Sequence, residues 1–286
     1  MNEQHIIQGL VTLLKKAQTE LPSDVENALK QACKKETGIA KIQLETILKN
    51  IALAKKIKYP MCQDTGMHTF FVTIGTESPY IKQIKKLITN AVKKATKEIP
   101  LRPNTVDPLT GKNHEDNLGD HAPSIIWDFA KGFDIEITVL PKGNGSENMS
   151  ALAMLNPSEG ITGAMDFIVN NIKKAGGNPC PPTIVGVGIG GTADSVMTLG
   201  KHALLRPVGI RNSNPKIASL EKQLITRLNK LGIGPMGLGG KTTVLDVHIE
   251  TAYRHPASFP VGVVVQCWAN RRAHMTLHAE GTWEVK

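Results

Sequence analysis

The sequence predicts a mixed α/β fold in which β-sheets are surrounded by α-helices. Two patterns alternate along the chain: stretches with apolar residues at helical spacing, and short runs rich in β-branched and aromatic residues. With 286 residues, of which 41% are hydrophobic, the chain is long enough to bury a sizeable core. No linker rich in proline, serine or charge divides it, so we expect residues 1–286 to form a single domain.

The helical pattern recurs along the whole chain. Residues 3–57 predict three helices, and the second opens with the capping-box sequence Ser23-Asp24-Val25-Glu26. Cys33 lies in this second helix, where we expect a small core residue. Further helices are predicted over about 78–99, 158–175, 193–203 and 214–231. Strands are predicted over 70–74, 133–140, 183–187, 243–249 and 261–266, with short strands near the C-terminus.

Charge and hydropathy exclude several classes of protein. The net charge is +9 and the pI is near 9.3, but the lysines fall in scattered pairs on the polar sides of helices. Only 4% of the residues are aromatic, which leaves little to stack on bases, so we expect no nucleic-acid partner. A cleft for small anions or an acidic partner chain would use the same charge. No apolar run can span a membrane and the polar N-terminus is unlike a signal peptide, so we expect a cytoplasmic protein.

Two stretches show neither helical nor strand periodicity. Residues 101–123 form a long polar segment that contains Arg102, and we expect a functional loop there. Residues 142–148 contain Gly143 and Gly145, which allow a tight turn. This turn either presents backbone N–H groups to an anion or joins two strands of a hairpin.

Two glycine-rich stretches imitate nucleotide-binding motifs. Gly186, Gly188 and Gly191 fit a Gly-x-Gly-x-x-Gly pattern, but no acidic residue follows at the distance needed to hold a ribose. Residues 234–242 end in Gly-Lys-Thr, yet proline stands at the first required glycine and a β-rich run replaces the helix that a phosphate loop needs. We therefore predict no nucleotide site.

Three of the four cysteines lie at borders between strands and loops. These are Cys62, Cys180 and Cys267, and in a cytoplasmic chain they are unlike a disulfide framework. They could bind zinc with His68 or His255 as a fourth ligand, although the close cysteine pairs of structural zinc sites are missing. They could also hold a four-iron, four-sulfur cluster with one iron left open, or be three unrelated buried cysteines.

A set of motifs resembles one enzyme family. The chain carries Cys-Gln-Asp-Thr-Gly at 62–66, Gly-Ser-Glu-Asn at 145–148, Cys-Pro-Pro-Thr-Ile-Val-Gly-Val-Gly-Ile-Gly-Gly-Thr at 180–192, Gly-Pro-Met-Gly-Leu-Gly-Gly at 234–240 and a run from His255 to Cys267. In this order they resemble the class I (iron–sulfur) fumarate hydratase and L-tartrate dehydratase family. More closely, the chain is similar to the α subunit of its two-subunit members.

The resemblance implies an iron–sulfur cluster domain with mixed β-sheets and a [4Fe-4S] cluster held by Cys62, Cys180 and Cys267. It implies reversible addition of water to a small dicarboxylic acid, with an open iron as the electrophile. Removing a hydroxyl group needs an acid, and Asp64, two residues from the proposed ligand Cys62, is our candidate for this catalytic role; His255 resembles the family's histidine near the substrate. For substrate binding, we expect Gln63 to donate a hydrogen bond and Gly145 to offer its backbone N–H, and Arg102 resembles a family arginine that binds a carboxylate.

The family resemblance also predicts a partner. Single-chain members carry a further, swivelling domain that this sequence lacks, so we expect a separate β subunit, as in an α2β2 assembly, and no activity of the chain alone. We expect fumarate hydration to L-malate, with dehydration of L-tartrate to oxaloacetate as the alternative. Two other classes remain: a non-catalytic iron–sulfur protein that senses redox state, and an anion- or nucleic-acid-binding module.

Overall fold

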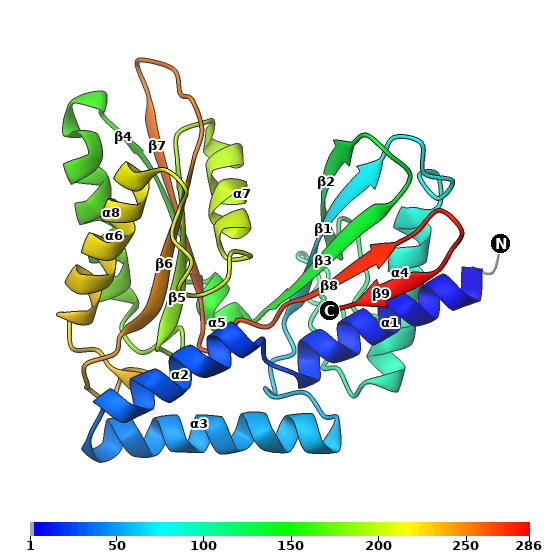
Figure 1. Ribbon diagram of the computed structural model, residues 1–286, viewed down its shortest axis with the longest axis horizontal. Helices are drawn as coiled ribbons and strands as arrows, with labels where there is room; N and C mark the ends of the chain where they lie inside the picture. The colour runs from blue at the N-terminus through cyan, green and yellow to red at the C-terminus, as the bar shows by residue number, and fades with distance from the viewer. Residues whose placement is uncertain (1–2) are drawn as a thin grey trace. The chain divides into compact units, whose positions relative to one another are not determined.

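The computed structural model describes residues 3–286, which form two compact units (Figure 1). The first unit contains residues 3–22, 50–143 and 271–286, and the second contains residues 23–49 and 144–270. Each unit combines separate stretches of the chain, so one domain over residues 1–286 stays a prediction. No helix within 3–286 has the length and apolar character needed to cross a membrane.

The first unit is built on a five-stranded mixed sheet with the order β2-β1-β3-β8-β9. The strands are β1 (Met67–Gly75), β2 (Ser124–Ala130), β3 (Ile135–Lys142), β8 (Ala273–Leu277) and β9 (Trp283–Val285). Only β1 and β2 run parallel, and α4 (Ile84–Glu98) lies between them in sequence, as a parallel crossover requires. The apolar face of α1 (Glu3–Thr19) packs with α4 against the sheet and forms one core with β1, β3 and β8.

The second unit has a four-stranded mixed sheet with the order β4-β7-β5-β6. The strands are β4 (Ala151–Leu155), β5 (Thr183–Ile189), β6 (Val244–Thr251) and β7 (Phe259–Gln266). Figure 1 shows α7 (Ala193–Ala203) on one face of the sheet and α6 (Gly160–Ala175) and α8 (Pro215–Asn229) on the other. Because helices cover both faces, every residue of β5 and β7 is buried, which explains their unbroken apolar runs.

The remaining helices are α2 (Ser23–Lys35), α3 (Gly38–Ile57) and α5 (Asn144–Glu147). Helix α2 belongs to the second unit, and the division between the units falls inside α3. Helix α5 is a single turn, and two 3-10 turns cover Pro157–Glu159 and Pro235–Gly237. The mixed α/β prediction and the three N-terminal helices are confirmed, and the segment from 101 to 123 contains no helix or strand.

Several local predictions are wrong. The 142–148 turn does not join a hairpin, because β3 and β4 belong to different sheets and α5 lies between them. Cys33 is half-buried, and it is the neighbouring Leu29 and Ala32 that α2 buries. Helix α4 begins at Ile84, since the chain first makes a turn in which the buried Tyr80 carbonyl accepts hydrogen bonds from the next residues. Strands β2 and β4 were not predicted.

Candidate functional site

In the first unit, the Cys62–Gly66 segment connects the end of α3 to β1. Hydrogen bonds fix the main chain at its entrance. Met61 N donates to Gln18 O over 3.0 Å, and the Asn50 side-chain amide donates to Met61 O over 2.7 Å. Cys62 itself is half-buried. The predicted site segment is therefore anchored to the core and presents a partly accessible thiol.

The Asp64 side chain lies in a hydrogen-bonded turn. Its Oδ1 accepts from Gly66 N over 2.9 Å and from Asn104 Nδ2 over 3.3 Å. Its Oδ2 lies only 3.0 Å from the position that a methyl group on Gly143 would occupy. The carboxylate thus has a fixed orientation, and a glycine at 143 provides the space that it fills.

The polar loop is joined to this segment through Thr65. Its buried hydroxyl accepts from Arg102 N over 3.1 Å and is 3.3 Å from Arg102 O. The side chains of Arg102 and Gln63 are exposed, and neither makes a hydrogen bond or ion pair within the described residues 3–286. The first unit therefore carries Cys62, Gln63 and Asp64 on one segment and joins the main chain of Arg102 to that segment through Thr65, while the roles of these residues stay predictions.

A buried polar network lies behind the segment, and the sequence did not indicate it. Arg271 donates from Nη1 to Gln18 Oε1 over 3.1 Å and from Nη2 to Asp64 O over 3.0 Å. Gln18 Nε2 donates to Thr65 O over 2.7 Å and lies 3.4 Å from His68 Nε2. Burial, with the positive charge of Arg271 as the second cause, lowers the pKa of His68 to about 4.

In the second unit, the main chains around Cys180 and Cys267 are directly joined. Trp268 N, next to Cys267, donates to Cys180 O over 3.2 Å. Cys180 follows the end of α6 and has a φ of +54°, and Cys267 follows β7. Both thiols are half-buried, and no disulfide forms among the described residues. Two of the three predicted ligands thus lie on adjoining loops of one unit.

Gly145 belongs to the same cluster of loops. A Cβ at this position would lie 3.3 Å from the carbonyl oxygen of Asn178, which is two residues before Cys180. Ser146 Oγ, in turn, lies 3.5 Å from Oε1 of the buried Gln266, which precedes Cys267. The short helix α5 is therefore held between the loops that carry the two cysteines.

His255 is not brought to these cysteines within the second unit. It is exposed on the loop before β7, whereas Cys267 follows the other end of that strand. An eight-residue strand spans about 23 Å. Its imidazole Nδ1 accepts from Ala257 N over 3.1 Å, which fixes the ring locally. Its predicted role near the substrate stays a prediction.

Neither glycine-rich stretch has the environment of a nucleotide site. A Cβ on Gly188 would come within 2.1 Å of Val196 O, so this glycine allows α7 to pack closely on β5. In the other stretch, Lys241 N and Thr242 N donate to the buried Glu36 carboxylate over 2.6–3.0 Å. An internal carboxylate thus takes the backbone N–H groups that a phosphate would need.

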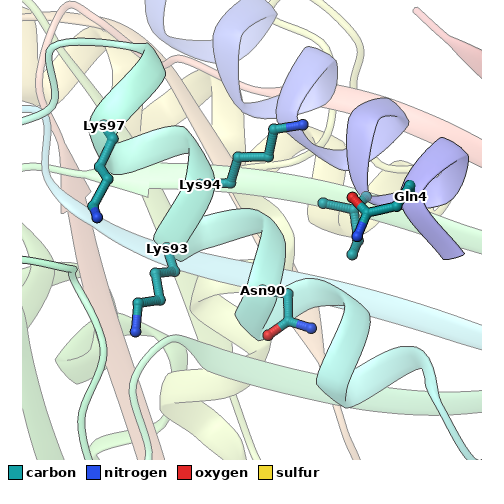
Figure 2. A pocket seen from close by; sticks show the side chains of 6 residues that line it. Gln4, Asn90, Lys93, Lys94 and Lys97 are labelled. Carbon is teal, nitrogen blue, oxygen red and sulfur yellow. The ribbon is translucent and has the colours of Figure 1, made fainter.

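The three lysines that line one pocket of the first unit do not converge on a common point (Figure 2). A pocket of about 320 Å³ between α1 and α4 is lined by Gln4, Ile7, Asn90, Lys93, Lys94 and Lys97. Figure 2 shows Lys94 extending toward α1, where it donates to Gln8 over 2.8 Å, while Lys93 and Lys97 point away from it. This arrangement is a solvated helix face, as the sequence predicted.

Each of the three cysteines predicted as cluster ligands is half-buried within its own unit, and the cluster that they would hold stays a prediction. Cys180 and Cys267 are half-buried on adjoining loops, and Cys62 is half-buried on an anchored segment of the other unit. Within each unit, across the described residues, no three His, Cys, Asp or Glu side chains gather into a metal-binding group. His68, one alternative zinc ligand, is fully buried and already bonded to Gln18.

Comparison with known proteins identifies the family of the chain. The family model described as Fumarate hydratase (Fumerase) matches residues 7–276. A Methanocaldococcus jannaschii protein, provisionally named L(+)-tartrate dehydratase subunit alpha, is 51% identical over 269 residues, 92% of this chain and 94% of its own. The L(+)-tartrate dehydratase subunit alpha of Escherichia coli strain UTI89 is 41% identical over 268 residues, 93% of this chain and 88% of its own. The same subunit of Shigella sonnei is 40% identical over the same length. The chain therefore belongs to the class I fumarate hydratase family, which makes it a hydro-lyase enzyme.

Proposed function

We propose that this chain is the catalytic α subunit of a hydro-lyase that reversibly hydrates fumarate to L-malate. The observation that carries the proposal is the placement of Asp64, a fixed carboxylate, two residues from Cys62, together with the joined loops of Cys180 and Cys267. Family members generally use an iron–sulfur cluster. When bound by these three thiolates, the cluster supplies an iron without a protein ligand that acts as a Lewis acid toward a substrate oxygen.

The chain's own residues supply the acid and the substrate contacts. In the hydration direction Asp64 takes a proton from water, and in the dehydration direction it returns that proton to the leaving hydroxyl group. Asn104 and Gly66 hold its Oδ1, which keeps the carboxylate oriented for this transfer. The exposed guanidinium of Arg102 suits one carboxylate of the substrate.

Three further residues of the chain are proposed to lie at the substrate. Gln63 is exposed beside Asp64 and donates a hydrogen bond to the substrate, and Gly145 offers its backbone N–H. His255 acts near the substrate. The base that removes the C–H proton lies outside this chain, on a separate β subunit in an α2β2 assembly. The relatives' designation as subunit alpha supports that partner.

Dehydration of L-tartrate to oxaloacetate is the second candidate, and the names of the relatives favour it. Both reactions remove or add water on a small dicarboxylate, so the same acid serves both. Anaerobic assay of the chain with its β subunit on fumarate and on L-tartrate separates them. Turnover of L-tartrate alone would overturn the fumarate assignment.

Iron binding tests the site itself. The chain is reconstituted anaerobically with ferrous iron and sulfide, and iron per chain is measured. Serine at Cys62, Cys180 or Cys267 should abolish stable incorporation, whereas Cys33→Ser, at the half-buried cysteine of α2, should leave it unchanged. Full activity of Asp64→Asn in the reconstituted complex would refute the assignment of Asp64 as the catalytic acid. High activity of the chain alone would refute the need for a β subunit.

A further inference from the structure

Among residues 3–286, Arg271 is the largest fully buried side chain, with 1% of its surface exposed. It does not lie in any of the family motifs described above. Two of its nitrogens are used within the first unit: Nη1 donates to Gln18 Oε1 and Nη2 donates to Asp64 O. A buried guanidinium thus holds the main chain at the proposed catalytic acid, from the core side.

The charge of Arg271 is not balanced locally. No carboxylate lies within 4.0 Å of its guanidinium among residues 3–286, in contrast to the half-buried Arg206 and Arg211, which pair with Glu221. Its Nε is buried without a hydrogen-bond partner across the same residues. Burying a guanidinium in this state is costly, because an arginine stays charged in a protein. Negative charge bound near this segment would offset that cost.

The hydrogen-bond roles in the network follow from Arg271. Since a guanidinium has only donors, the Gln18 atom that faces it must be the carbonyl oxygen Oε1. The Gln18 amide nitrogen therefore points to Thr65 O and to His68 Nε2, which acts as the acceptor in the neutral ring. Arg271 thus fixes the orientation of Gln18, and together they hold the carbonyls of Asp64 and Thr65.

We infer that Arg271 is a positioning residue that holds the Cys62–Gly66 segment, and that its buried charge stabilises the negatively charged cluster-bound form of that segment. The inference rests on the proposed function for its second half only. The first half concerns the chain before any cluster is bound, so the two can be tested apart.

Hydrogen exchange of the cluster-free chain tests the positioning. Arg271→Met removes both donors and the charge while keeping an unbranched side chain, so exchange of the amides at 61–66 should become at least about tenfold faster. Arg271→Lys keeps the charge but has a single donor nitrogen in place of the two that bind Gln18 and Asp64, so it should restore part of the protection. Unchanged exchange at 61–66 in Arg271→Met would overturn the positioning role.

Cluster retention tests the role of the charge. After anaerobic reconstitution with iron and sulfide, the visible absorbance of the cluster is followed in the presence of a chelator. The cluster absorbance of Arg271→Met should decay about tenfold faster than that of the unchanged protein, and the decay rate of Arg271→Lys should lie between the two. Arg206→Met removes a half-buried arginine that pairs with Glu221 and Glu250 in the second unit, and it serves as the control for lost stability.

The control variant separates a specific effect of Arg271 on the cluster from a general loss of stability. If Arg206→Met loses its cluster as fast as Arg271→Met, the effect is general destabilisation and the inference is wrong. If the unchanged protein takes up no iron, the proposed function fails and the cluster role of Arg271 falls with it, while hydrogen exchange still decides whether Arg271 positions the segment.

Discussion

Replacing His68 by glutamine should make the first unit less sensitive to acid. His68 is 3% exposed, and its pKa falls to about 4 because the ring is buried and because Arg271 adds positive charge nearby. In the unfolded chain the pKa of a histidine is about 6.5. The unfolded state therefore takes up a proton at higher pH than the folded state does, and acid favours unfolding.

The sign and size follow from these two pKa values. The stability that neutral His68 provides is fully present above about pH 6.5 and is lost as the pH falls toward 4. Between about pH 7.5 and about pH 5 the loss is about 2 kcal/mol. Glutamine does not titrate, so His68→Gln should lack this component of the pH dependence, even if the substitution lowers stability at every pH.

Urea unfolding at the two pH values, followed by circular dichroism and fluorescence, measures the difference. His278 is the matched control in the same unit, because a hydrogen bond to Asp134 raises its pKa. Its stabilising effect is present at low pH and is lost as the pH rises through its raised pKa, so His278→Gln should shift the pH dependence in the opposite direction. If His68→Gln and the unchanged protein lose the same stability on acidification, the assigned state of His68 is wrong.

Two further substitutions test the geometry. In Gly143→Ala the new methyl group would lie 3.0 Å from Asp64 Oδ2 and should displace that carboxylate. Steady-state assays of the complex should then show a kcat lowered by about tenfold. An unchanged kcat would argue against Asp64 as the acid. Glu36→Gln removes the charge from the side chain that accepts hydrogen bonds from the backbone N–H groups of Lys241 and Thr242. The free energy of unfolding, measured by urea titration, should fall by about 1.5–3 kcal/mol. Glu45 is exposed, so the control Glu45→Gln should change this free energy by less than about 0.5 kcal/mol.

The sequence was a good guide to elements with strong local signals. The helices α6 and α8 begin and end near their predicted bounds because Gly176 and Asn214 act as caps, and such caps are local. Strand β2 was missed because it lies at the edge of its sheet and most of its side chains are exposed, so no apolar alternation marks it. Sheet order was beyond prediction, since it depends on pairing between distant strands.

The candidate site likewise contains residues that the sequence indicates and residues that it does not. Residues that would do chemistry, such as Cys62 and Asp64, stand in motifs where several reactive residue types occur close together in sequence. The residues that hold them do not. Gln18 lies at the end of α1, 253 residues before Arg271, and neither stands out by type or spacing. Their roles become visible only where the fold places them beside the carbonyls of Asp64 and Thr65.

The glycine-rich stretches show why a motif needs its structural context. Gly188 in the second unit serves helix packing, because Val196 O occupies the space of a side chain, and the pattern imitates a dinucleotide site without its function. The loop at 234–242 does present backbone N–H groups to an anion, but that anion is the carboxylate of Glu36. A carboxylate supplied by the chain itself keeps the loop closed to phosphate and ties it to the end of α2. Backbone N–H groups that bind nucleotide phosphates in other proteins thus bind a carboxylate in this one. They stabilise the second unit, in which Cys180 and Cys267 lie.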